Sequence, residues 1–167
     1  RFFGGLVARR LTADGERLYC TVDYTGDVHV LDAGTGTTLS TIPGTSGTQE
    51  ILVDGTHVFC IGKDDGSSMK LVCYDSTAGK VVWTAEDRNF MGQLTCVGPD
   101  EILYHNRREV VCLNLSDGKA RWTYQPPVPV KKPQPDKKKA KKSNSRQPQM
   151  MLIAGDNAIL ADGVDLH

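Results

Sequence analysis

The sequence predicts an all-β fold, namely a β-propeller fragment of about three and a half four-stranded antiparallel blades. Three observations predict it. The first two are that one hairpin motif occurs in three copies and that a second motif, upstream of it, occurs in four copies. A third is that no window carries apolar residues at i, i+3, i+4 and i+7 over three turns, as a helix would require. Four short strands in roughly 40 residues are typical of a propeller blade. A closed ring needs roughly 4–8 blades, so three and a half are expected to form only an open arc. The expected parent has seven or eight blades.

The first motif is the outer hairpin of each unit. It reads VHVLDAGTGTTLST at 28–41, KLVCYDSTAGKVVWT at 70–84 and VVCLNLSDGKARWT at 110–123. An Asp or Asn is followed after four residues by Gly and, in two copies, after four more by Trp. The structural repeat positions are Asp32, Gly36, Asp75, Gly79, Trp83, Asn114, Gly118 and Trp122. The Asp or Asn side chain is expected to accept hydrogen bonds from backbone N–H groups of the turn, and the Gly adopts a positive φ at little energetic cost. The Trp is predicted to fill the wedge between adjacent blades.

The second motif is a turn that leads into a strand. It reads ADGERLYC at 13–20, VDGTHVFC at 53–60, VGPDEILY at 97–104 and AGDNAILA at 154–161. A polar Gly or Asp turn before a short apolar run indicates a hairpin. In the second unit the four strands are expected near 50–53, 57–62, 69–75 and 80–85. The last copy has no completed partner hairpin, so a fourth blade is begun and cut off.

The domain boundaries follow from these repeats. Residues 1–125 are expected to hold the blades, at about 11–45, 50–86 and 93–125, and residues 150–167 to begin the next blade. Between them, 126–149 is rich in Lys and Pro and has no large apolar residue after Val130. Such a composition cannot bury a core, so this stretch is predicted to be a disordered surface insert.

Charge is unevenly distributed, although the formal net charge is +0. Eight cations lie between residues 131 and 146, and outside this basic insert 19 acidic residues face 12 basic ones. This balance excludes a specific nucleic-acid surface on the folded part. An anionic partner for the insert stays open beside the favoured interpretation of a solvated linker. No apolar run approaches the roughly 20 residues of a membrane span.

Two segments of the outer hairpins resemble a known family. CYDSTAGKVVW at 73–83 and CLNLSDGKARW at 112–122 are similar to A-x-D-x-x-T-G-K-x-x-W, the tryptophan-docking motif of quinoprotein propellers built from pyrroloquinoline-quinone (PQQ)-like repeats. VLDAGTGTTLS at 30–40 is a weaker copy, in which Ser40 stands in place of Trp. The resemblance covers most of 11–125 and resumes at 151.

The resemblance implies a fold with several possible functions. Quinoprotein alcohol dehydrogenases hold PQQ and calcium near the propeller axis, but their site motifs and vicinal cysteine pair have no match here. Other proteins with these repeats bind no quinone, among them assembly scaffolds of the outer-membrane lipoprotein type. We therefore predict no catalytic, cofactor-binding or metal-binding residue in this fragment, with PQQ and calcium expected only if the parent is a true quinoprotein.

The predicted function is a non-catalytic binding or scaffolding module of a larger bacterial protein. Its partners are the other blades of the parent and a further protein, and the family resemblance favours a periplasmic or extracytoplasmic location. One alternative is part of a PQQ-dependent dehydrogenase whose active site lies outside the fragment. Another is a WD-type cytosolic scaffold, which unpaired cysteines favour.

Five cysteines occur, without any C-x-x-C pair. Cys73 and Cys112 share one repeat position, and Cys20 and Cys60 share another. Equivalent positions of neighbouring sheets lie about 10 Å apart, too far for a disulfide with a Cα separation under about 7 Å. They are predicted to be small core residues.

Two turn segments are predicted to be ordinary exposed connections. Asp64-Asp65-Gly66 lacks the closing carboxylate of a calcium loop. His105-Asn106 lies at a tight hairpin, where we expect an exposed turn histidine.

Overall fold

The computed structural model describes residues 10–23, 25–63, 68–87, 95–106, 109–125, 150–154 and 157–161. Within these ranges the chain forms 14 β-strands and no helix. They make three four-stranded sheets and one two-stranded sheet, all antiparallel, in which neighbouring strands follow each other in the chain. This confirms the predicted all-β architecture of successive blades.

Blade 1 is the first sheet, and its strands are β1 (Leu11–Asp14), β2 (Arg17–Cys20), β3 (Val28–Asp32) and β4 (Thr38–Ile42). The turn between β1 and β2 contains Gly15, whose φ of 56° lies in the left-handed region that Gly adopts without strain. The upstream motif therefore forms the inner hairpin, and the Asp-to-Gly motif forms the outer one.

Blade 2 consists of β5 (Thr48–Asp54), β6 (His57–Lys63), β7 (Met69–Asp75) and β8 (Lys80–Asp87). Each strand includes the segment expected from the sequence. Five consecutive residues of β6 are buried, whereas β8 alternates between exposed and covered positions. β6, inside the sheet, is covered on both faces by the neighbouring blades, whereas β8, the outermost strand, lies at the rim.

Blade 3 consists of β9 (Thr95–Val97), β10 (Glu101–His105), β11 (Val110–Asn114) and β12 (Ala120–Tyr124). The last sheet pairs β13 (Met150–Ala154) with β14 (Asn157–Ala161). The predicted insert at 126–149 lies outside the described residues. In the described part of the chain, no helix is long and apolar enough to cross a membrane.

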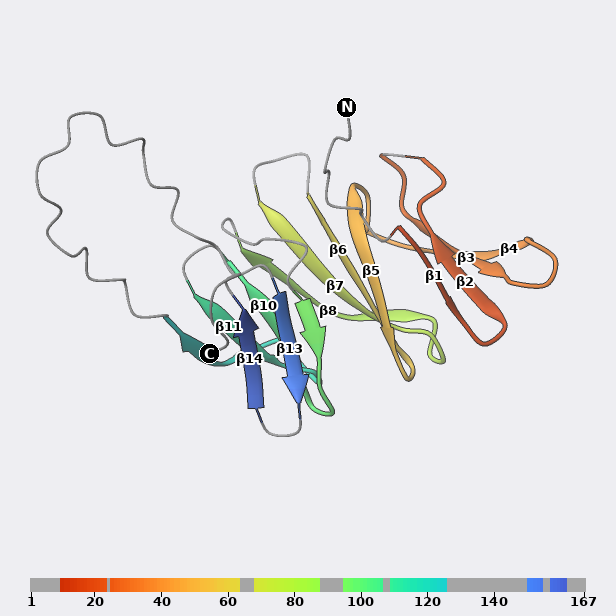
Figure 1. The fold of residues 1–167 in the computed structure, drawn as a ribbon. Coiled ribbons are helices and arrows are strands. Elements are labelled where there is room, and N and C mark those ends of the chain that lie inside the picture. Colours follow the sequence, from red (N-terminus) through yellow and green to blue (C-terminus); the bar gives the residue numbers. More distant parts are fainter. Residues whose placement is uncertain are drawn as a thin grey trace, which may run out of the picture.

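The sheets stack in chain order and bury side chains between them (Figure 1). One buried cluster lies between blades 1 and 2, and contains Tyr19, Val28, Val30, Ile42, Ile51, Val58, Cys60, Val72 and Tyr74. A second lies between blades 2 and 3, and contains Phe59, Ile61, Met69, Leu71, Cys73, Trp83, Ile102, Tyr104, Val111 and Leu113. Blade 2 is thus covered on both faces. The innermost strands β1 and β5 also touch, as do β9 and β13.

A β-bulge recurs in all three blades, where the register shifts between the third and fourth strands. In each case one residue of the outer strand has no partner: Leu39, Val82 or Arg121. An extra residue of this kind bends the strand and turns its side chain outward. Leu39 and Val82 are accordingly 56% and 40% exposed.

Candidate binding surface at the blade joints

The outer hairpin turns share their backbone construction in all three blades, and those of blades 1 and 2 also share a carboxylate acceptor. The carboxylate of Asp75 accepts bonds from the backbone amides of Thr77 and Ala78, both at 2.8 Å. The Gly79 amide donates to the Asp75 carbonyl, and Gly79 has a φ of 65°. The Asp32 turn repeats these contacts, and Gly36 and Gly118 also have positive φ.

These amide donors set the charge state of the turn carboxylates. Bonds from the Ala78 and Thr77 amides lower the pKa of Asp75 from its ordinary value. Bonds from the hydroxyl and the amide of Thr35 lower the pKa of Asp32. Both turns therefore favour an ionised acid, whereas blade 3 has the uncharged Asn114 at this position.

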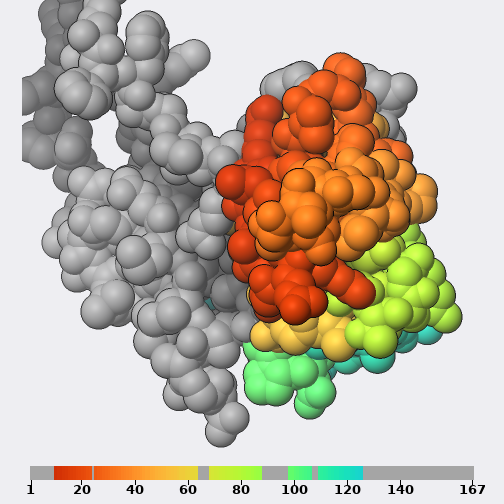
Figure 2. Space-filling view, turned by 90° about the vertical axis from the view of Figure 1, so that its right-hand side faces the viewer, coloured from red at the N-terminus to blue at the C-terminus, as the bar shows by residue number. Residues whose placement is uncertain are grey.

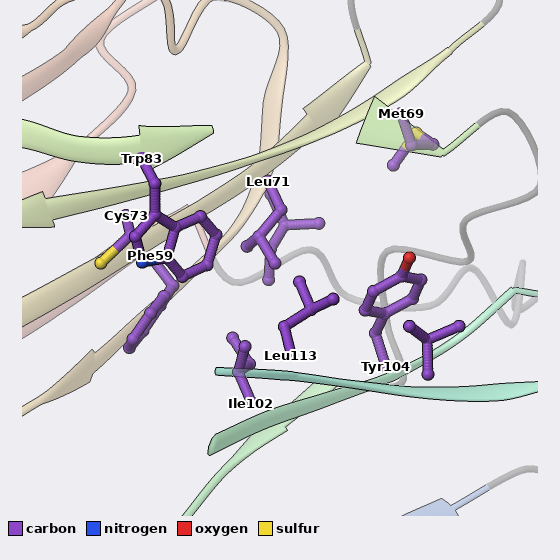
Figure 3. Close-up of a cluster of buried hydrophobic side chains, with 10 residues drawn as sticks. Phe59, Met69, Leu71, Cys73, Trp83, Ile102, Tyr104 and Leu113 are labelled. Atoms are coloured by element: carbon purple, nitrogen blue, oxygen red, sulfur yellow. The ribbon is translucent and has the colours of Figure 1, made fainter. Parts of the chain in front are cut away.

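Trp83 closes the joint between blades 2 and 3 (joint 2/3). Its indole Nε1–H donates to the carbonyl oxygen of Leu115 in the facing turn, at 2.7 Å. Trp83 is only 8% exposed, and the centroid of its ring lies 6.2 Å from the centroid of the Phe59 ring (Figure 3). A Cβ added to Gly118 would lie 2.6 Å from the indole. The ring therefore occupies the space directly over the Gly of the next turn.

Trp122, at the same repeat position of blade 3, is 40% exposed, and Tyr124 on the same strand is 45% exposed. The sheet next to blade 3 has two strands in the described ranges, β13 and β14. An outer hairpin such as the one that Trp83 meets is therefore not present opposite Trp122 among the described residues.

The joint between blades 1 and 2 (joint 1/2) has no Trp. Ser40 pairs with Val30 on β3 just as Trp83 pairs with Cys73 on β7, and Ser40 is exposed. Arg17 of β2 makes the contact instead, because its guanidinium donates to the carbonyl oxygen of Ser76.

The acceptor in the two joints is the same backbone group. Ser76 follows Asp75 as Leu115 follows Asn114, so the two carbonyls are equivalent. The space above the turn differs, however, because the nearest atom to a Cβ added at Gly79 is the Tyr74 hydroxyl, 3.8 Å away. Sequence reasoning missed Arg17, since its repeat position holds His57 in blade 2 and Glu101 in blade 3.

No disulfide joins Cys20, Cys60, Cys73 or Cys112 to another of the described side chains. Cys60, Cys73 and Cys112 are buried, and Cys20 is half-buried. Burial raises the pKa of Cys73 to about 12 and raises that of Cys60 as well. These thiols remain protonated and poorly nucleophilic at neutral pH.

A polar end cluster lies at one end of joint 2/3. The carboxylate of Asp87 accepts bonds from the Tyr104 hydroxyl at 3.2 Å and from the Asn106 amide at 2.8 Å. The carboxylate of Glu109 accepts from Asn106 and from Gln125, both at 3.3 Å. Burial and the neighbouring Asp87 raise the pKa of Tyr104. The cluster joins three strand ends, and no single motif predicts it.

The prediction of an exposed turn at His105-Asn106 is wrong. His105 is 2% exposed and Asn106 is 4% exposed. His105 is the last residue of β10 and is buried in blade 3. Asn106 closes the hairpin, because its backbone N–H donates to the Glu109 carbonyl at 3.0 Å. Burial lowers the pKa of His105. Asp64-Asp65-Gly66 lies outside the described residues.

A calcium ion, such as the one in a quinone site, requires several oxygen ligands that lie close together in the fold. Among the residues that the structure describes, no three His, Cys, Asp or Glu side chains are close enough to hold a metal ion.

Comparisons with known proteins agree on the fold. The model of a family described as outer membrane protein assembly factor BamB matches residues 3–127 and 67–165. No curated protein matches the chain in sequence.

Among solved structures, BamB from Moraxella catarrhalis aligns with a TM-score of 0.60 and 14% identity over 92% of this chain and 41% of its own. The designed protein Ika4 aligns with a TM-score of 0.64 and 10% identity over 100% of this chain and 93% of its own. A quinohemoprotein alcohol dehydrogenase from Pseudomonas putida HK5 aligns with a TM-score of 0.52 and 14% identity over 69% of this chain and 20% of its own. The chain thus spans less than half the length of BamB from Moraxella catarrhalis and of the quinohemoprotein alcohol dehydrogenase.

Proposed function

The chain belongs to the family described as outer membrane protein assembly factor BamB, and we propose that it is a non-catalytic PQQ-like propeller module that gives a larger protein a binding or scaffolding surface. The family's description supports this proposal, because an assembly factor acts through contacts between proteins. Further blades of the parent are one partner, and another protein, bound at the rim, is the second.

One observation carries the proposal: the outer strand of blade 1 is exposed and uncharged. Four of the five residues of β4 are exposed, and they are Thr38, Leu39, Ser40 and Thr41. In the residues of β8 that pair equivalently, Val81–Ala85, only Val82 and Thr84 are exposed, and Trp83 is buried. Figure 2 shows the orange residues of blade 1 at the molecular surface. Leu39, turned outward by the bulge, is the apolar centre of this rim.

The rim assignment is tested by photocrosslinking in the full-length protein inside its own cells. A benzophenone amino acid at position 39 should give one adduct of defined mass, identified by mass spectrometry. The same amino acid at position 82, the equivalent bulge residue of blade 2, should give none. Leu39→Lys should dissociate the complex at native mass, whereas Val82→Lys should not. Equal adducts at both positions would show that the surface is not specific.

The rival activity has a separate test. Full-length protein is mixed with PQQ and calcium, and the quinone absorbance and dye-linked alcohol oxidation are recorded. We expect neither. Turnover would make the chain part of a quinoprotein dehydrogenase and would contradict the non-catalytic module.

A further inference from the structure

We infer that joint 1/2 binds an aromatic side chain of the partner protein, seated over the turn at Gly79 and against Arg17. This inference rests on the proposed function, because it names the chemistry with which a partner would hold the rim of blade 1. The position is the one that Trp83 fills from within the chain at joint 2/3.

The two joints differ in how much of the space over their Gly is used. At joint 2/3 the Trp83 indole covers Gly118 so closely that a Cβ would collide with it at 2.6 Å. At joint 1/2, Gly79 is exposed and has the same φ within a few degrees, 65° against 67°. The backbone that receives the ring is therefore preserved at Gly79, while the ring is missing because Ser40 replaces it.

The chemistry around Gly79 suits an aromatic ring in particular. The Ser76 carbonyl is already bonded by the Arg17 guanidinium, so an incoming ring needs no hydrogen-bond donor there. A guanidinium presents a flat cationic face on which aromatic rings stack. A phenylalanine or tyrosine of the partner can therefore occupy this position as well as a tryptophan can. A lysine or arginine would be repelled by the like charge of Arg17.

The surrounding surface continues this apolar contact. Leu39 is 56% exposed and adjoins Ser40 on β4. A partner segment that lies along β4 would cover Leu39 and insert its aromatic residue at the Ser40 position. An uncharged strand and a vacant ring position at the same rim thus select an extended partner segment with an aromatic anchor.

The test uses N-acetyl-tryptophanamide as the probe and full-length protein labelled with ¹⁵N-glycine. The amide of Gly79 should shift saturably with the probe, with a dissociation constant in the millimolar range. The amide of Gly118 should not shift, because Trp83 already covers it. Ser40→Trp should abolish the Gly79 response by filling the position from within, and Arg17→Met should weaken it several-fold.

The matched control is Arg121→Trp, which adds the same ring at the equivalent bulge residue of β12, in blade 3 and away from joint 1/2. It should leave the Gly79 response unchanged. Absence of a Gly79 shift up to the solubility limit of the probe, or an equal shift at Gly118, would overturn the inference.

Failure of the inference is distinguishable from failure of the proposed function. If the adduct formed at position 39 persists in Ser40→Trp protein, a partner binds the rim without an aromatic anchor, and only the inference is wrong. If position 39 gives no specific adduct although Gly79 binds the probe, the ring position exists but the rim is not the partner surface.

Discussion

Joint 1/2 and joint 2/3 are held at the same backbone carbonyl by different donors. Trp83 reaches the Leu115 carbonyl with its indole N–H and buries its ring. Arg17, a half-buried residue, reaches the equivalent Ser76 carbonyl with its guanidinium and leaves Gly79 exposed. The directional bond is thus kept in both joints, and the buried ring over the turn is kept in only one. We expect the hydrogen bond to fix how the blades meet and the buried ring to make joint 2/3 the more stable of the two.

The largest expected effect is that of Trp83→Ala. Removing a buried Trp should cost about 3–5 kcal/mol of unfolding free energy, because a cavity forms beside Phe59 and the Leu115 carbonyl loses its donor. Urea unfolding followed by far-UV circular dichroism measures it. Ser40→Ala, at the same repeat position of joint 1/2, should change the unfolding free energy by less than about 0.5 kcal/mol. Equal losses would mean that ring burial does not distinguish the joints.

The two turn glycines give the next test. Gly79→Ala should cost about 1–2 kcal/mol, the price of left-handed backbone in an L-residue. Gly118→Ala should cost roughly 1–3 kcal/mol more, because its Cβ collides with the Trp83 ring. The difference in unfolding free energy isolates that collision.

A double variant checks the interpretation of the glycine pair. In a Trp83→Ala background the extra cost of Gly118→Ala should largely disappear, since the ring that it strikes is gone. If the extra cost persists, the difference between Gly118 and Gly79 has another origin than the indole.

The sequence predicted the parts of this comparison that repeat. The Asp-to-Gly spacing located three outer hairpins, and Ser40 was recognised as the departure at the Trp position. The donor that replaces the Trp was not predictable, because Arg17 lies on another strand, 23 residues before Ser40, at a position without a repeating residue type.

The polar end cluster escaped prediction for a similar reason. Asp87, Asn106 and Glu109 come from the ends of β8, β10 and β11, and only the stacking of blades brings them together. The burial of His105 was missed because a turn signal in the sequence does not report what covers the turn.

A smaller effect is expected from Arg17→Met, which keeps the apolar stem and removes the donor. The Ser76 carbonyl loses a charged partner, and the unfolding free energy should fall by about 1–2 kcal/mol. The control is Arg121→Met, which breaks an exposed pair with Glu101 at 3.3 Å and should cost under about 0.5 kcal/mol. If the two changes cost the same, Arg17 acts only as a surface charge and joint 1/2 has no directional bond of its own.

The smallest effect concerns acid, and it separates blades 1 and 2 from blade 3 at one repeat position. Amide bonds lower the pKa of Asp75 and hydroxyl and amide bonds lower that of Asp32, so the folded chain binds fewer protons there than the unfolded chain. Their contribution to stability is present above the unfolded pKa of about 3.9 and is lost as the pH falls through the lower folded values.

The variant Asp75→Asn keeps an acceptor for the turn amides but cannot titrate, as Asn114 cannot. Urea unfolding measured in steps from pH 6 to pH 2 should therefore show a shallower loss of stability in Asp75→Asn, and a still shallower one when Asp32→Asn is added. An unchanged acid limb in the double variant would show that these turns gain nothing from their charge.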